Sequence, residues 1–110
     1  MSKFKEISVN YFNLFSRKEI ESLKLMFDRN IKLRDWEIDA EGIDDVIKAN
    51  LNIFNSVESI KVKPLLIVEE DRRVFAELDI VINGKDSIKV VDIIEFNEKS
   101  KITSIRAFKG

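Results

Sequence analysis

The chain has 110 residues, enough for one domain spanning residues 1–110 with a single hydrophobic core. Its 19 basic and 20 acidic side chains give a formal charge of −1, so no basic excess supports binding to nucleic acid. The chain has no cysteine, which excludes disulfides and thiolate chemistry. It also has no histidine, the commonest metal ligand and general base. Any proton transfer must use Asp, Glu, Tyr or Lys; we expect no metal and no cofactor.

The apolar segments are too short to span a membrane, and the N-terminus lacks the apolar stretch of a signal peptide. Hydrophobic residues make up 45% of the chain, which is typical of a folded domain and not of a disordered one. The sequence thus predicts a cytoplasmic protein that does not associate with membranes.

The first half of the chain is predicted to contain three helices and one strand. Apolar residues at helical spacing predict a helix over residues 3–15. Ser16-Arg17-Lys18-Glu19 has the pattern of a capping box and opens a second helix, whose apolar residues run from Ile20 to Phe27. Residues 31–37 alternate as a strand, and residues 39–42 break it. A third helix follows, with Ile43, Val46, Ile47, Leu51 and Phe54 on its apolar side.

The second half is predicted to be four antiparallel strands. These cover residues 60–68, 73–82, 88–96 and 101–108. Pro64 places the first of them at a sheet edge or at a bulge, and Asn83-Gly84 is a strong hairpin signal. The order of elements predicts an α+β fold with the helices packed on one face of the sheet.

Asp92 lies in the middle of an apolar strand face. Because side chains alternate between the two faces of a strand, Asp92 shares its face with Ile88, Val90, Ile94 and Phe96. A carboxyl group in such a row must be protonated, be partnered, or face a cavity. The pattern marks Asp92 as a candidate functional residue.

Two further polar groups are predicted to point inward. On the strand over residues 31–37, Lys32 and Arg34 mark the solvent side, so Asp35 belongs to the apolar face. Tyr11, the only tyrosine, lies one helical turn from Phe15 on the apolar side of the first helix. Tyr11, Asp35 and Asp92 are therefore expected to point inward from three different elements.

Several segments resemble one known family. Tyr11-Phe12-Asn13-Leu14-Phe15, Phe27-Asp28 and Ile31-Lys32-Leu33-Arg34-Asp35 resemble the N-terminal half of a nuclear transport factor 2-like (SnoaL-like) domain. The segment from Val90 to Phe108 resembles the last hairpin of that family. The resemblance implies a cone-shaped barrel, in which three N-terminal helices pack on a curved, mostly antiparallel sheet and enclose a pocket.

Within this family, the three inward polar residues are most similar to those of ketosteroid isomerase. The resemblance implies that Asp35 is a general base, and that Tyr11 and protonated Asp92 donate hydrogen bonds to an enolate oxygen. The chain would be a cofactor-independent isomerase or lyase that acts on a small, mostly apolar carbonyl compound. The expected walls of the substrate pocket are Phe15, Phe27, Phe54, Leu78 and Val90.

The same residues also have structural interpretations. Asp92 would bond a helix end or pair with Arg106, Asp35 would satisfy a turn in solvent, and Tyr11 would be a core aromatic residue. The chain would then be a non-catalytic ligand-binding or dimerisation module. A third alternative is a hydrolase or dehydratase that activates water in the same pocket.

A second apolar row is predicted on the opposite, outer face of the sheet. It consists of Phe75, Val81, Val91, Ile93 and Ile105, with Glu77, Asp79, Lys89 and Glu95 as its rim. A contiguous exposed apolar patch is typical of an interface, so we expect a two-fold homodimer through the sheet.

Overall fold

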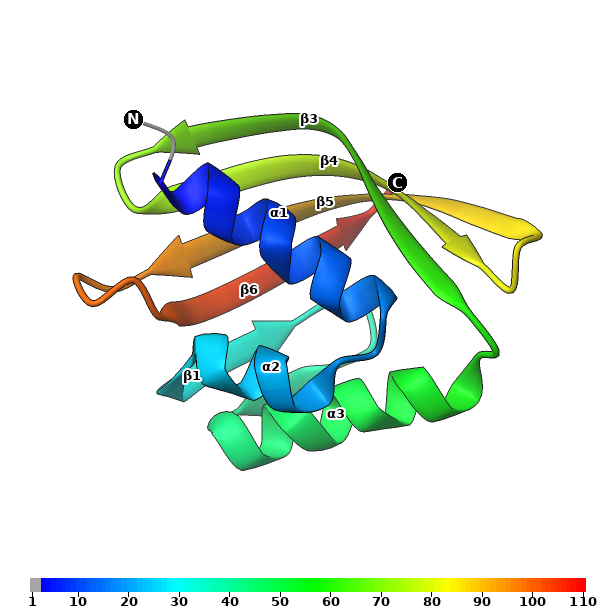
Figure 1. Ribbon diagram of the computed structural model, residues 1–110, viewed down its shortest axis with the longest axis horizontal. Helices are drawn as coiled ribbons and strands as arrows, with labels where there is room; N and C mark the ends of the chain where they lie inside the picture. The colour runs from blue at the N-terminus through cyan, green and yellow to red at the C-terminus, as the bar shows by residue number, and fades with distance from the viewer. Residues whose placement is uncertain (1–2) are drawn as a thin grey trace.

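Three helices pack on one face of a six-stranded curved sheet in the computed structural model, which describes residues 3–110 (Figure 1). The elements are α1 (Lys3–Ser16), α2 (Ile20–Met26), β1 (Phe27–Arg34), β2 (Asp39–Glu41), α3 (Ile43–Ser56), β3 (Ile60–Glu70), β4 (Arg73–Ile82), β5 (Asp86–Phe96) and β6 (Ile102–Lys109). The sheet is not closed. The predicted α+β class and cone-like arrangement are confirmed.

The sheet has the strand order β2-β1-β6-β5-β4-β3. Strands β3 to β6 form an antiparallel meander, as predicted, and β1 joins the meander by pairing in parallel with β6. The strand β3 lies at the edge and carries a register shift directly after Pro64, so both expectations for this residue hold. The parallel pair brings the N-terminal half of the chain against the C-terminal strand.

The core lies between the helices and the concave face of the sheet (Figure 1). It is built from apolar side chains that recur at helical spacing on α1 and α3 and at alternate positions on the strands. Fully enclosed members include Phe12, Leu23, Ile31, Val46, Val74, Leu78, Ile94 and Ile102. Burial of these apolar side chains is the main term that stabilises the fold.

Four local predictions are corrected. Phe27 does not end the second helix, because β1 begins at this residue; β1 then stops at Arg34, before Asp35. The predicted break at residues 39–42 contains the short strand β2, which pairs with β1. The capping box does not form: the Ser16 hydroxyl donates to the carbonyl of Phe12 (2.8 Å) and accepts from the amide of Val62 (2.9 Å), and so ties α1 to β3.

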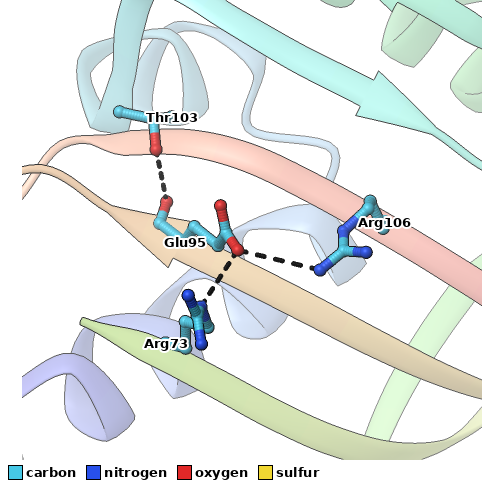
Figure 2. Close-up of polar contacts among 4 residues, drawn as sticks. All are labelled: Arg73, Glu95, Thr103 and Arg106. Atoms are coloured by element: carbon cyan, nitrogen blue, oxygen red, sulfur yellow. Dashed lines mark hydrogen bonds and ion pairs between the residues drawn. The ribbon is translucent and has the colours of Figure 1, made fainter. Parts of the chain in front are cut away.

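The helices do not cover the outer face of the sheet, which is partly apolar. Leu66, Val68 and Val91 are 59%, 49% and 40% exposed, and Phe75 and Ile93 are half-buried beside them. Arg73 and Arg106 both reach Glu95 on this face, at 3.1 Å and 3.7 Å (Figure 2). We call Leu66, Val68, Phe75, Val91 and Ile93 the outer apolar patch.

Ile105 is not a member of the outer patch, contrary to prediction. It is 2% exposed and faces the helices. Phe96 pairs with Ile102 but Glu95 pairs with Ser104, so Thr103 is an extra residue in β6. Such a bulge moves every later side chain of the strand to the other face. Beside this bulge, the Thr103 hydroxyl donates a hydrogen bond of 3.2 Å to the Glu95 carbonyl; Figure 2 draws this contact.

Candidate active site

A mostly apolar cavity of about 260 Å³ opens between the helices and the inner face of the sheet. Its volume is slightly below the usual range of ligand pockets, roughly 300–1,000 Å³, so it suits a compound of one or two rings. Tyr11, Asp35 and Asp92 all line this cavity. The structure therefore brings the three predicted polar residues together from α1, the β1–β2 loop and β5.

The Tyr11 side chain is 5% exposed and packs among aromatic rings. Its ring centroid lies 5.9 Å from that of Phe15 and 6.3 Å from that of Phe27. Burial, and next the negative charge of Asp92, raise the pKa of Tyr11 well above its usual value. The hydroxyl consequently remains a protonated hydrogen-bond donor.

Asp92 lies at the centre of β5 and is 8% exposed. Its register partners are Ala76 and Ala107, whose small side chains leave space beside the carboxyl group. Burial, and next the charge of Asp35, raise the pKa of Asp92 to about 7. Arg106 cannot be its partner, because Arg106 lies on the outer face with Glu95. At neutral pH a large share of Asp92 is thus a neutral acid that can donate a hydrogen bond.

Asp35 follows the last residue of β1 and is half-buried. Its Oδ1 accepts hydrogen bonds from the amides of Glu37 (2.7 Å) and Ile38 (2.6 Å), and its own amide donates to the Ile38 carbonyl (2.9 Å). The turn role named among the structural interpretations is therefore present. No amide of the described chain donates to Oδ2, so one oxygen of this cavity-lining carboxylate is left for a ligand.

The predicted wall residues divide into two groups. Phe15, Leu78 and Val90 line the cavity. Phe27 and Phe54 lie in the core behind the wall instead, where Phe54 packs edge-on against Phe15 at a centroid distance of 4.8 Å. Because Phe27 begins a strand and does not end a helix, its ring supports Tyr11 and does not face the opening.

Asn50 is a polar cavity residue that our reading of the sequence did not select. It is 2% exposed, and its Nδ2 has no hydrogen-bond partner within residues 3–110. A signal for it exists, since Val46, Asn50 and Phe54 succeed one another at intervals of four on the buried side of α3. The side chain adds a fourth polar group to the wall.

Within the described part of the chain, no three acidic side chains come close enough to hold a metal ion. In the same region, no helix has the length and apolar character needed to cross a membrane.

Comparisons with known proteins identify the fold. No family model and no curated protein matches the sequence. Among solved structures, a protein from Shewanella denitrificans, provisionally named a SnoaL-like polyketide cyclase, superimposes with a TM-score of 0.89 at 11% identity, over 100% of this chain and 92% of the other. A protein from Kribbella flavida, provisionally named a ketosteroid isomerase, has a TM-score of 0.83 at 10% identity, over 100% and 79%.

SalBIII, an epoxide hydrolase/cyclase-like enzyme with a role in pyran ring formation in the polyether salinomycin, has a TM-score of 0.80 at 22% identity, over 99% of this chain and 92% of that one. These likenesses show that the chain has the nuclear transport factor 2-like fold. The fold and the cavity together define a pocket-containing α+β protein of enzyme-like architecture. Because folds host many functions, the activity has to be argued from the residues of the site.

Proposed function

We propose that the protein is a cofactor-independent isomerase that moves a proton next to the carbonyl group of a small, mostly apolar substrate. One observation carries the proposal: two carboxyl groups with opposite surroundings face the same cavity. Asp35 is half-buried and bonded by two amides, whereas Asp92 is buried with its pKa raised to about 7. Pairs of acids in contrasting environments are typical of acid–base sites.

The chemistry requires three groups in defined roles. The Asp35 carboxylate removes the proton α to the carbonyl, which leaves an enolate, and returns it to the γ carbon as the double bond moves into conjugation. Tyr11 and protonated Asp92 donate hydrogen bonds to the enolate oxygen as its charge develops. Such donors act strongly in a cavity from which most water is excluded.

Replacement of the base tests the proposal. We expect Asp35→Asn to lower kcat by about 10²–10⁴-fold on a bicyclic β,γ-unsaturated ketone, because an amide cannot accept the proton. The assay follows the absorbance of the conjugated product. Asp39→Asn, an exposed acid on β2, is the matched control and should retain full turnover. Equal turnover by wild type and Asp35→Asn, with the same circular dichroism spectrum, would discard this role for Asp35.

A hydrolase or cyclase is a second candidate, supported by the same pair of acids. With Asp92 protonated, it could protonate a leaving oxygen while Asp35 deprotonates a water or a hydroxyl nucleophile. The similarity to SalBIII gives this alternative some weight. An epoxide substrate distinguishes the two, because only a hydrolase or cyclase consumes it.

A non-catalytic binding module is supported by the turn that Asp35 closes with Glu37 and Ile38. This alternative predicts that ligands bind the cavity but are released unchanged, and that Asp35→Asn lowers stability and not turnover.

A further inference from the structure

A second hollow adjoins the cavity on the other side of the Asp35–Trp36 turn. It has a volume of about 560 Å³ and is walled by Arg34, Arg106, Phe108 and Lys109. Asp35, Trp36 and Ala107 line both hollows. Because β1 ends at Arg34 while β6 continues to Lys109, the second hollow lies beside the end of β1. A molecule seated in the cavity could therefore extend past this turn and around the end of β1 toward Arg34 and Arg106 on the outer face. We call this second hollow the cationic groove.

The cationic groove is rich in positive charge. Arg34 and Arg106 are register partners in the parallel β1–β6 pair, so their side chains leave the sheet next to each other. The Lys109 ammonium lies 5.8 Å from the centroid of the Trp36 ring. Asp35 is the one acid in the groove wall, and its Oδ1 is already bonded by two amides.

These cations are incompletely neutralised by the protein. Arg106 has an ion pair with Glu95 at 3.7 Å, which engages one end of its guanidinium group. Across residues 3–110, no carboxylate lies within ion-pair distance of Arg34 or Lys109. Adjacent like charges on paired strands are unfavourable, and an anion placed between them would relieve the repulsion. Guanidinium groups are well suited to this because they bind planar anions through two hydrogen bonds.

We propose that the cationic groove binds an anionic group, a carboxylate or a phosphate, of the same molecule whose carbonyl end enters the cavity. The inference rests on the proposed function and narrows its substrate class to amphipathic anions. The apolar part of the substrate fills the small cavity, the reacting carbonyl lies near Tyr11 and Asp92, and the charged end stays at the opening. Trp36, which is 43% exposed between the two hollows, would contact the bridging part of the substrate.

A pair of probes tests the cationic groove. Naphthol presents a phenol to the cavity, and a hydroxynaphthoate adds a carboxylate on the far ring. We expect the hydroxynaphthoate to bind about tenfold more tightly in isothermal titration calorimetry at low salt, because charge-assisted hydrogen bonds form at its carboxylate. The advantage should shrink as salt is raised, because the groove is exposed to solvent. A hydroxynaphthyl phosphate shows whether the site also takes the dianion.

Substitutions of groove residues test where the carboxylate of the hydroxynaphthoate binds. Arg34→Gln and Lys109→Gln should each reduce the advantage of the hydroxynaphthoate and leave the affinity for naphthol unchanged. Lys24→Gln, on the exposed side of α2, should change neither affinity. Equal binding of the two probes, or no binding of the hydroxynaphthoate, would overturn the inference. Failure of the proposed function would give a different result. The hydroxynaphthoate would still bind in an Arg34-dependent manner, but Tyr11→Phe would leave naphthol binding unchanged.

Discussion

The protonation of Asp92 links stability to pH with a predictable sign. Its pKa rises from 3.8 to about 7 on folding, so the folded state binds more protons than the unfolded chain between these values. The resulting stabilisation is complete below about pH 4 and is lost as pH rises through about 7. It amounts to at most about 4 kcal/mol. The free energy of unfolding attributable to Asp92 should therefore decrease from pH 5 to pH 8.

Urea denaturation of wild type and Asp92→Asn at several pH values measures this link. The difference between them should change with pH, because the amide does not titrate. Asp79→Asn is the control: its hydrogen bond with Ser87 lowers the pKa of Asp79, so its own contribution is lost only in more acidic solution. Parallel stability curves for wild type and Asp92→Asn would mean that Asp92 is already ionised in the folded protein.

The buried Asn50 side chain should lower the free energy of unfolding of the ligand-free protein. Its buried Nδ2 has no partner within the described chain, and an unsatisfied buried polar group costs about 1–3 kcal/mol. We expect Asn50→Leu, of similar size, to raise the free energy of unfolding by about 1 kcal/mol in thermal or urea denaturation. Asn50→Asp should have the opposite effect because it buries a charge. A less stable Asn50→Leu protein would show that the amide is satisfied, for example by bound water.

The candidate site could be predicted from the sequence wherever side chains alternate regularly along a strand or recur at regular helical spacing. Asp92 stands in the middle of a regular strand and Tyr11 in the middle of a regular helix, so alternation and helical spacing placed both correctly at the cavity. Alternation predicted the wrong face for Ile105, because the bulge at Thr103 depends on pairing with β5 and leaves no local signal in the sequence. Asn50 was not selected as a site residue, because a single polar residue on a helix is usually exposed.

At the scale of elements, α3 is held at its C-terminus by a residue from the α1–α2 connection. The Lys18 ammonium donates to the carbonyls of Phe54 (2.8 Å), Val57 (2.8 Å) and Glu58 (3.2 Å). These groups lie at or just beyond the helix end, where carbonyls lack intrahelical partners and the helix dipole favours a cation. A long-range contact thus performs the capping that no basic residue in the last turn of α3 supplies.

Lys18→Met should lower the free energy of unfolding by about 1–2 kcal/mol, because it leaves the two partly buried carbonyls, those of Phe54 and Val57, unpaired while keeping the aliphatic stem. Lys48→Met, at an exposed position of α3 itself, is the matched control and should change stability little. Urea denaturation measures both. If the two variants were equally stable, the three hydrogen bonds of Lys18 would contribute nothing beyond those made by water.

The types and order of the long elements were predictable, whereas their junctions and pairings were not. Hydrophobic spacing found all three helices and five of the six strands. It extended the second helix over Phe27 because an apolar residue there fits helical and strand patterns equally well. The parallel pairing of β1 with β6 joins residues about 70 positions apart, and no local pattern encodes it.

At the scale of the whole molecule, the helices cover only one face of the sheet (Figure 1). The outer apolar patch occupies β3, β4 and β5, on the opposite side of the sheet from the cavity and away from the strand β1 that carries Arg34. Arg73 and Glu95 border it at one end of these strands, and Asp79 and Lys89, 3.6 Å apart, border it at the other. Apolar surface of this kind between charged borders is typical of an interface.

The borders of the patch are self-complementary. A two-fold axis that runs along the strands, between β4 and β5, would place Arg73 opposite Glu95 of the partner subunit, and Asp79 opposite Lys89 of the partner subunit. An axis across the strands would place Arg73 opposite the partner's Asp79, which is again an opposite charge. We therefore propose that the second copy expected from the sequence packs here, sheet against sheet.

Val91→Glu tests this dimer because it adds a charge at the centre of the patch, beside Glu77 on the neighbouring strand. We expect it to weaken association by at least about 2 kcal/mol, roughly 30-fold in Kd, measured by sedimentation equilibrium. Leu25→Glu is the control, since Leu25 is 72% exposed on α2, away from the sheet face, and its substitution should leave association unchanged. Glu77, which was expected at the rim, lies between Leu66 and Val91. Glu77→Gln should strengthen the dimer by removing this charge from inside the patch. A wild-type protein that sediments as a monomer at micromolar concentrations would contradict the dimer, and the patch would then be simply exposed.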